Sequence, residues 1–377
     1  MASVDGGDSR VRGAATRFHV APALDRSAVE RWREFAERIP WAHYRQDPAW
    51  AEIERRDRAG ATRRPCFFWA ERDGSLRLTA LGLRRSLPVP GRAFWEFDKG
   101  PTFHDIEALD EWLPWLLARC GREAARLRIA PPVPLHEMGD DVETVLERHG
   151  LARRRMLGGW ATLVADISRD EDHILRAFRP ATQRSIRKSL RLGIEVDVQD
   201  SPPGWAVLSA LESELARSAP VSPVQPAEVE RISRLWLRNG SGGTIMVARH
   251  QGEPLAAALV IKHKRTAHLP MIPSSRRYRE LPASHLLVWE AMRWAKLHGC
   301  TEFDLAGYSL VAQPGDALWG VNQFKRGFVT VDEVHKSVAI HERVRSPLLE
   351  VSARTIRDAQ ARWHRHSTSR TEGRTDR

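Results

Sequence analysis

Two shortages in the sequence exclude whole classes of protein. Its 377 residues contain only three cysteines, Cys66, Cys120 and Cys300, which lie far apart and share no close spacing with histidines. They indicate reduced core thiols, not a disulfide framework or a zinc site. No apolar run approaches the roughly 20 residues that a membrane-spanning helix needs, and residues 1–17 lack the apolar core of a secretory signal. We therefore expect a soluble, cytoplasmic protein without a metal site.

Lysine is also scarce. Only seven of the 59 basic residues are lysines, and the other 52 are arginines. An ammonium and a guanidinium differ in hydration, geometry and ease of pKa shift, so a lysine in such a chain indicates a place where a compact cation is needed. Lys99 and Lys325 gain interest for this reason. The net charge of +11 favours an anionic partner, which includes nucleic acid, a membrane surface and a phosphorylated substrate.

The composition and the order of expected elements are typical of a globular chain with an internal repeat. Hydrophobic residues make up 42% and charged residues 28%, and this length favours two domains of roughly 150 residues each. Expected helices, a hairpin, a helix and a strand recur at a separation of roughly 180 residues, which indicates a tandem α/β fold. We expect Ser27–Ile39 as the first ordered element, stopped by Pro40, and a last amphipathic helix over Ser346–Trp363.

The domain boundaries follow from this repeat and from the composition of the ends. The expected organisation is a disordered end at 1–16, a first domain at 17–150, a second at 151–330, a segment at 331–365 that packs back on the first, and a disordered basic tail at 366–377.

Four segments in a fixed order carry a family resemblance. Gly100-Pro101 follows a strand, Arg179–Ile194 opens the second domain, the helix Trp289–Lys296 comes next, and Phe303–Gly307 precedes Phe324–Phe328. Together they resemble the FemABX peptidoglycan aminoacyltransferases over about residues 40–345. The resemblance implies an α/β (α+β) fold of two tandem GNAT-like domains. The long helical arm of some members does not fit between residues 226 and 244.

The resemblance also implies an activity and partners. Family members transfer an amino acid from aminoacyl-tRNA to an amine on the stem peptide of a peptidoglycan precursor. For this chain it implies an acyltransferase of cell-wall biosynthesis that needs no cofactor. Aminoacyl-tRNA would be its co-substrate, a UDP- or lipid-linked muropeptide its acceptor, and the enzyme a monomer with peripheral membrane contact.

The closing motif supplies the first candidate site residues. Aminolysis of an ester requires a positioned amine, a stabilised oxyanion and a proton acceptor. By the resemblance, Lys325 stabilises the oxyanion or the departing ribose oxygen, and Arg326 contacts phosphate. Asp304 ends an apolar strand, where its carboxylate either accepts a proton or forms a cap or an ion pair. Lys325 as an exposed turn cation is the alternative.

The first-domain turn and the basic helix complete the list. Asp105 follows Gly100-Pro101 near the place of a family carboxylate, displaced by one residue, and a plain loop role is its alternative. Lys99 is a candidate substrate-binding residue in the same turn. Arg184, Arg187 and Lys188 lie three and four residues apart and can share one helix face, which would bind phosphate or simply be solvated.

Three other functions remain open. An acyl-CoA N-acyltransferase acting on a sugar or small amine is disfavoured, because residues 276–283 lack a glycine-rich turn for the pyrophosphate and contain a proline. An aminoacyl-tRNA-dependent enzyme of peptide natural product assembly is compatible with every motif. A non-catalytic protein that binds RNA or a membrane surface would use the basic helix and tail.

Overall fold

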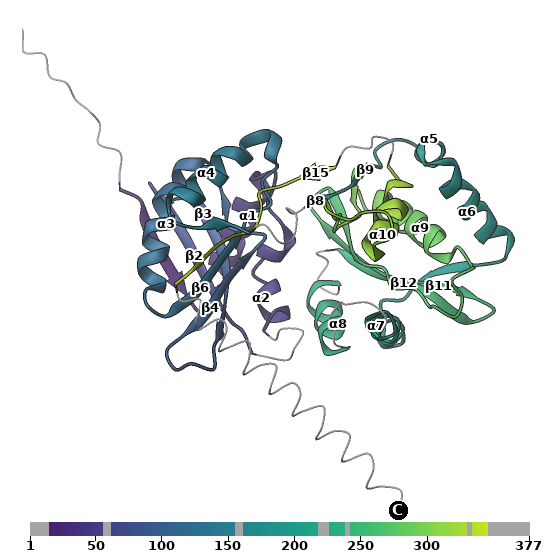
Figure 1. The fold of residues 1–377 in the computed structure, drawn as a ribbon, viewed down its shortest axis with the longest axis horizontal. Coiled ribbons are helices and arrows are strands. Elements are labelled where there is room, and N and C mark those ends of the chain that lie inside the picture. Colours follow the sequence, from purple (N-terminus) through teal and green to yellow (C-terminus); the bar gives the residue numbers. More distant parts are fainter. Residues whose placement is uncertain are drawn as a thin grey trace, which may run out of the picture.

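The protein consists of two α/β units that lie side by side (Figure 1). The computed structural model describes residues 15–55, 62–154, 161–217, 226–237, 242–329 and 334–345. Each unit is built on one sheet, and within each sheet a single pair of neighbouring strands is parallel, β4 with β6 and β13 with β14. Within the described ranges, no helix combines the length and apolar character needed to cross a bilayer.

The first unit carries an eight-stranded sheet with the order β1-β2-β3-β4-β6-β16-β7, and β5 pairs with β3. Its helix α3 begins at an Asp105 N-cap and buries a stripe of leucine and tryptophan side chains. The elements are β1 (Arg17–Ala21), α1 (Arg26–Arg38), α2 (Trp50–Ile53), β2 (Arg64–Arg72), β3 (Ser75–Ser86), β4 (Ala93–Asp98), β5 (Thr102–Phe103), α3 (Ile106–Cys120), β6 (Ala124–Ala130), α4 (Asp140–Arg148) and β7 (Ala152–Arg153).

The second unit carries a six-stranded sheet with the order β10-β11-β12-β13-β14-β9. Its strands β11 and β12 are nearly continuous runs of buried aliphatic residues, as expected for a sheet covered on both faces. The elements are β8 (Ala161–Thr162), β9 (Val164–Asp166), α5 (Glu171–Ala177), α6 (Pro180–Arg191), β10 (Glu195–Val198), α7 (Pro202–Ala216), α8 (Pro226–Ile232), β11 (Gly243–His250), β12 (Glu253–His263), β13 (Thr266–Met271), α9 (Ala283–Leu297), β14 (Glu302–Asp304) and α10 (Ala317–Arg326).

After α10 the chain returns to the first unit. Strand β15 (His335–Lys336) pairs with β8, and β16 (His341–Val344) enters the first sheet between β6 and β7. Within residues 334–340 the chain forms one short strand, β15, and β16 begins at His341. The predicted final helix over 346–363 lies outside the described residues.

The structure differs from the sequence-based expectations at two places. The first described element is strand β1, which precedes α1, and the N-cap of α1 is Asp25, whose side chain accepts from the Ala28 amide. Helix α10 was not predicted, and the Phe324–Phe328 motif spans its last turn, the Gly327 C-cap and the residue that follows. Leu318 and Val321 of α10 are exposed, so they form no stripe that faces a core.

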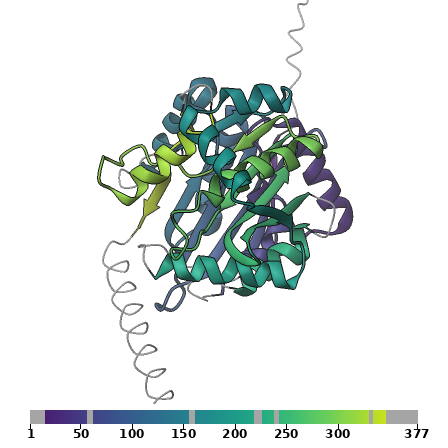
Figure 2. The ribbon, with the colours of Figure 1, turned by 90° about the vertical axis from the view of Figure 1, so that its right-hand side faces the viewer.

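A shared apolar core joins the two units. Trp50 of α2 and Tyr44 pack against Trp236 with ring centroids 5.5 and 6.2 Å apart, and all three side chains are buried. Buried residues of β11 and β12, such as Ile245 and Leu259, belong to the same cluster. Because interiors are close-packed, this contact holds the cavity walls of the two units at a set separation. Figure 2 shows both sheets from the side of the second unit.

Candidate functional site between the two units

A cavity of about 480 Å³ lies where the two units meet. Its first-unit wall is formed by the segment before α2, the turn after β4 and the residues that follow β6, and its second-unit wall by β8, β13, β14 and the turn after β14. The polar lining residues are His43, Tyr44, Arg45, Lys99, Glu137, Thr162, His263, Lys264, Thr266, His268, Glu302, Asp304, His335, Lys336 and Ser337. Among the described residues no group of His, Cys, Asp or Glu has the arrangement of a metal site.

A histidine and an aspartate form the central pair of this cavity. Strands β13 and β14 are parallel with His268 opposite Asp304, and the Nδ1 atom of His268 lies 3.1 Å from Oδ2 of Asp304. The other carboxylate oxygen accepts from the Thr162 hydroxyl and, at 2.7 Å, from the Ala306 amide. Burial opposes the charge on Asp304, but His268 and these donors outweigh it and hold the pKa of Asp304 at about 2. Asp304 is therefore an ionised, fixed partner for the imidazole.

Lys325 joins the two motifs that the sequence singled out. Its Nζ atom donates to the carbonyl oxygens of Ala306 and Gly307 at 2.5 and 2.6 Å, so the helix α10 holds the turn that follows Asp304. Ala306 occupies the left-handed region at φ +53°, a conformation that needs such support. Lys325 is 8% exposed, and its burial, partly offset by the charge of Asp304, lowers its pKa to about 8. An ammonium has three donors, so these two bonds leave one N–H, and Lys325 itself is not among the residues that line the cavity.

Lys99 enters the cavity from the first unit. It occupies the left-handed region at φ +54° in the turn after β4. Burial lowers its pKa to about 8, although Asp98 and Asp304 favour its charge. The buried Gln46 holds this turn, because its amide donates to the Asp98 carbonyl at 2.7 Å and its oxygen accepts from the Leu81 amide at 2.8 Å. A side chain at position 100 would overlap Gln46, which explains the glycine there.

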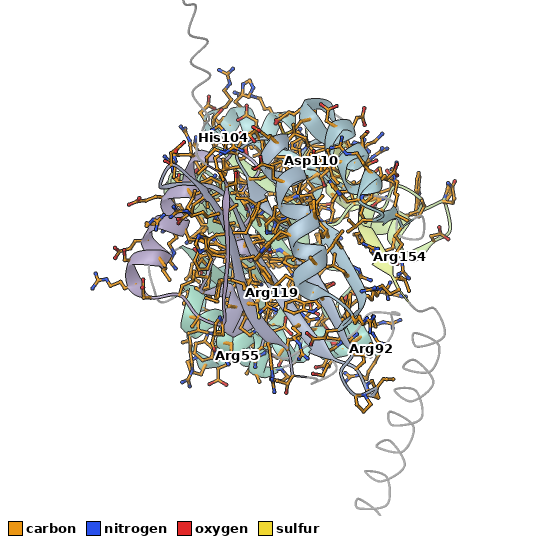
Figure 3. All side chains as sticks on the ribbon, turned by 90° about the vertical axis from the view of Figure 1, so that its left-hand side faces the viewer. Arg55, Arg92, His104, Asp110, Arg119 and Arg154 are labelled. Atoms are coloured by element: carbon orange, nitrogen blue, oxygen red, sulfur yellow. The ribbon has the colours of Figure 1, made fainter. Side chains whose placement is uncertain are left out.

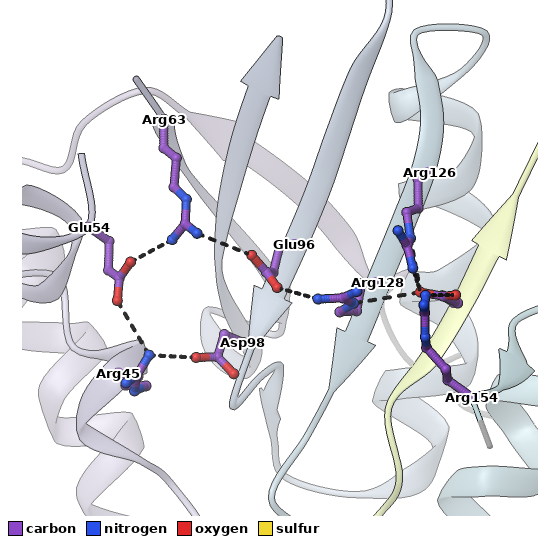
Figure 4. Close-up of polar contacts among 9 residues, drawn as sticks. Arg45, Glu54, Arg63, Glu96, Asp98, Arg126, Arg128 and Arg154 are labelled. Carbon is purple, nitrogen blue, oxygen red and sulfur yellow. Dashed lines mark hydrogen bonds and ion pairs between the residues drawn. The ribbon is translucent and has the colours of Figure 1, made fainter. Parts of the chain in front are cut away.

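A network of ion pairs runs from this turn across the first sheet (Figure 4). Asp98 contacts Arg45 at 2.8 Å, Arg45 contacts Glu54, and Arg63 connects Glu54 to Glu96. Arg128 then links Glu96 to Glu342, a residue of β16 that also contacts arginines of β6 and the β7 end. Partly buried pairs that share partners fix geometry better than isolated surface pairs. The network anchors Asp98 beside Lys99.

The cavity environment keeps two further histidines neutral. Burial lowers the pKa of His43 well below its usual value, and the nearby His268 and Lys99 act in the same direction. Burial also lowers the pKa of His263 to about 3. The rings of His43 and Tyr44 lie 5.2 and 5.1 Å from that of His268. The His43 and Tyr44 rings therefore lie along one side of the His268–Asp304 pair.

The glycine of the closing motif has a packing role. A Cβ atom on Gly327 would lie 2.2 Å from the Thr182 hydroxyl of α6, so no larger residue fits between α10 and α6. The Arg179 amide donates to the Gly327 carbonyl at 3.0 Å. Phe324 and Phe328 are core aromatics with ring centroids 5.2 Å apart.

The remaining predicted site residues lie elsewhere. Asp105 is not among the cavity-lining residues, because its carboxylate accepts from the Ala108 amide as the N-cap of α3 and pairs with Arg77. Burial disfavours its charge, but the Ala108 amide, His104 and Arg77 hold its pKa below the usual value. Figure 3, which looks at the side of the first unit that faces away from the second, labels the neighbouring His104. The structure thus places Asp105 in a helix cap.

The basic helix also lies away from the cavity. Arg184, Arg187 and Lys188 are exposed on α6, at the end of the molecule away from the first unit (Figure 1). Arg187 donates to Gln183 at 3.2 Å, and none of the three pairs with an acidic residue of the described ranges. Arg326 lies with its guanidinium 5.5 Å from the ring centroid of Tyr308, in a second hollow next to the cavity.

Lys99 and Asp304 both line the cavity and Lys325 holds a turn of its wall, whereas the sequence did not indicate His268, Thr162 or Gln46. The pairing of the His268 strand with the strand of Asp304 is not visible in the sequence. A parallel pair is separated by a whole helix in the chain, so no local pattern shows which residues face each other. The sequence signal for this site was His268 itself, a histidine in an otherwise apolar strand.

Comparisons with known proteins point to one fold. A family model described as an acetyltransferase (GNAT) domain matches residues 176–326. The UDP-N-acetylmuramoylpentapeptide-lysine N(6)-alanyltransferase of Weissella viridescens is 23% identical over 349 residues, which are 89% of this chain and 98% of that protein.

Two solved structures extend the likeness to both units. The crystal structure of FemX superposes with a TM-score of 0.72 at 15% identity, covering 89% of this chain and all of FemX. A tandem GNAT protein of the clavulanic acid biosynthesis pathway gives a TM-score of 0.53 at 15% identity, over 88% of this chain and 99% of that one. These likenesses confirm the prediction of two tandem GNAT-like domains.

Proposed function

We propose that this chain, which belongs to the FemABX family of acyltransferases, transfers an amino acid from aminoacyl-tRNA to an amine on the stem peptide of a peptidoglycan precursor. The Weissella viridescens relative, matched over nearly its whole length, is named for the transfer of alanine to a lysine N6 amine of a muramoyl pentapeptide. The same class of reaction at this site makes the chain an aminoacyltransferase. The aminoacyl-tRNA donor and the lipid- or UDP-linked form of the acceptor are the finer parts of the proposal.

The observation that carries the proposal is the His268–Asp304 pair in the cavity between the units. With Asp304 ionised, the Nδ1–H of His268 donates to it, and Nε2 is left as an acceptor that has no partner among the described residues. An attacking ammonium group must lose its protons before and during attack on an ester carbonyl. His268 is the proposed general base for this step, oriented by Asp304.

The proton and electron movements then follow. The amine nitrogen forms a bond to the ester carbonyl carbon, His268 takes the amine proton, and the carbonyl oxygen becomes an oxyanion. Collapse of this intermediate breaks the bond to the ribose oxygen, which takes the proton from His268. The third N–H of Lys325, at the Ala306–Gly307 turn, is the proposed donor to the oxyanion or to the departing oxygen. Lys99 faces the same space from the first unit.

An N-acyltransferase that uses acyl-CoA is the second candidate, favoured by the acetyltransferase family model over residues 176–326. Its pyrophosphate would need free backbone amides at the start of α9. The α9 N-cap is Pro282, which has no amide hydrogen, and its carbonyl accepts from the Ser189 hydroxyl of α6 at 3.0 Å. This supports aminoacyl-tRNA over acyl-CoA as the donor.

One experiment separates these functions. The full chain is incubated with a muropeptide precursor and either a mixed aminoacyl-tRNA pool or acetyl-CoA, and product masses are read. We expect an aminoacyl mass increment with the tRNA pool, absent in a His268→Gln variant that remains folded. An acetyl increment, or no product from either donor, contradicts the proposal.

A further inference from the structure

Exposed apolar side chains gather on one segment beside the cavity. Eight large hydrophobic side chains are exposed in the described part of the chain, and four of them lie within residues 310–321. A contiguous group of this kind needs an explanation that single exposed residues do not. The four are Leu310, Val311, Leu318 and Val321, which are 38%, 61%, 54% and 41% exposed.

The segment is built to hold these side chains together. The buried Asn322 accepts from the Ser309 amide at 3.1 Å and donates to the Ser309 carbonyl at 2.8 Å, which fastens the loop to α10. Leu310 and Val311 follow directly, while Leu318 and Val321 are three residues apart on the helix and share a side of it. In Figure 2 this loop and α10 stand out at the left edge of the molecule.

A basic hollow of about 730 Å³ opens beneath the same segment. Its lining includes His136, Arg326 and Lys336 and contains no acidic side chain among the described residues. Tyr308 and Trp319 contribute aromatic walls. Lys336 lines both this hollow and the cavity, and Gly307 of the cavity directly precedes Tyr308 of the hollow. The hollow and the cavity therefore adjoin each other at Lys336.

We propose that residues 308–321 form a docking surface for an anionic lipid bilayer. The four apolar side chains enter the boundary between head groups and acyl chains, and the basic hollow faces the lipid phosphates. The charge pattern favours a bilayer, because the apolar rim and the acid-free basic hollow match the two layers of its surface. Asp316, the acidic residue of this segment, accepts from the Gln313 amide at 2.8 Å.

The docking surface has a consequence for the substrate, which rests on the proposed function. A bilayer at residues 308–321 places lipid phosphates beside the hollow that shares Lys336 with the cavity. An acceptor whose stem peptide hangs from a membrane-bound diphosphate can then reach the His268–Asp304 pair without leaving the bilayer. The acceptor would be lipid-linked and not a soluble nucleotide-linked precursor.

The test measures binding of the full chain to vesicles by flotation, independently of transfer activity. Vesicles contain equal parts of phosphatidylglycerol and phosphatidylcholine, or phosphatidylcholine alone. We expect binding to the anionic vesicles and a loss of about tenfold or more in the Val311→Asp/Leu318→Asp double variant, because charges do not enter the acyl boundary. The matched control is Leu297→Asp at the end of α9, where the side chain is 79% exposed outside this segment.

The other outcomes overturn the proposal. They are failure of the unchanged chain to bind anionic vesicles, equal loss in Leu297→Asp, or full binding by the double variant with loss only after charge reversal of Arg184 and Arg187 on α6. A Val311→Cys chain carrying an environment-sensitive dye provides a second readout, with the unchanged chain as the blank. No blue shift on addition of anionic vesicles also contradicts docking. Transfer to a soluble acceptor with intact vesicle binding would refute the lipid-linked acceptor alone.

Discussion

His268 and Asp304 face each other across a parallel strand pair, and the 3.1 Å contact between Nδ1 and Oδ2 leaves Nε2 as the ring nitrogen that Asp304 does not engage. The carboxylate is itself held by Thr162 and the Ala306 amide. The imidazole is thus fixed by a carboxylate that is itself fixed by a hydroxyl and a backbone amide. Proton transfer by a general base requires such a fixed position. Lys325 donates to the carbonyl oxygens of Ala306 and Gly307, in the turn that follows Asp304.

His268→Gln should lower kcat/KM for aminoacyl transfer by roughly 10²–10⁴, the usual contribution of a general base. The amide can keep the hydrogen bond to Asp304 but cannot accept the amine proton. The measurement is transfer rate against pH at matched folding, judged by circular dichroism. His250→Gln on the hairpin between β11 and β12 is the control and should retain full rate. A His268→Gln enzyme as fast as the unchanged chain would rule out this base.

Asp304→Asn should cost on the order of 2 kcal/mol of unfolding free energy at neutral pH. The pKa of Asp304 falls from 3.8 to about 2 in the folded chain, so its contribution is complete above the unfolded pKa and is lost as pH falls through the folded one. The stability difference between the two proteins should therefore shrink between about pH 4 and pH 2. Denaturant unfolding measures it, with the exposed Asp141→Asn as control. A difference independent of pH would contradict the assignment.

Transfer activity should fall as pH rises through about 8, because Lys99 and Lys325, each with a pKa of about 8, lose their charge there. The unfolding free energy should change in the opposite direction. Between about pH 8 and 10 the unfolded chain binds more protons at these lysines than the folded one, so the unfolding free energy rises with pH. An activity loss with rising stability cannot be unfolding.

Lys99→Arg separates the two lysines in this pH profile. Arginine stays charged over this pH range. If deprotonation of Lys99 causes the loss of activity at alkaline pH (the alkaline limb), the variant should lose activity only at a higher pH. An unchanged limb assigns it to Lys325, and Lys325→Met should then remove most of the activity at every pH. A rate that stays level through pH 10 would show that neither ammonium is needed.

Gln46→Leu should destabilise the chain by roughly 1–3 kcal/mol, because the Asp98 carbonyl and the Leu81 amide would be left buried without their partner. Loosening of the turn should also raise KM, since Lys99 loses its support. Thermal unfolding and steady-state kinetics measure the two effects. The exposed Gln313→Leu serves as the control for stability. Unchanged melting of Gln46→Leu would mean that the turn does not depend on this clamp.

Charge reversal on α6 tests the predicted phosphate contact. Arg184→Glu with Arg187→Glu should weaken binding of tRNA. The slope of the logarithm of the binding constant against the logarithm of the salt concentration should become shallower by about one for each lost phosphate contact. The control is Arg17→Glu with Arg38→Glu, two exposed cations of the first unit that give the same change in net charge. If both pairs weaken binding equally, α6 acts only through the overall charge.

Local pattern determined much of this protein. The apolar runs of β2, β3, β11 and β12, bounded by turn residues, and the stripes of α3 and α9 are visible in the sequence, because burial along a single element depends only on near neighbours. The scarcity of lysine drew attention to Lys99 and Lys325, and the order of motifs indicated the tandem fold. These signals needed no knowledge of which elements touch.

Only the tertiary structure decided the site. His268 meets Asp304 through a parallel pairing that spans the whole of α9, Gln46 reaches Gly100 from another element, and Lys325 turns toward the Ala306–Gly307 carbonyls through the unpredicted α10. Asp105, a candidate by its position in the sequence, serves as the N-cap of α3, where its carboxylate accepts from the Ala108 amide. Contacts between distant segments depend on packing and strand register, which a single sequence does not display.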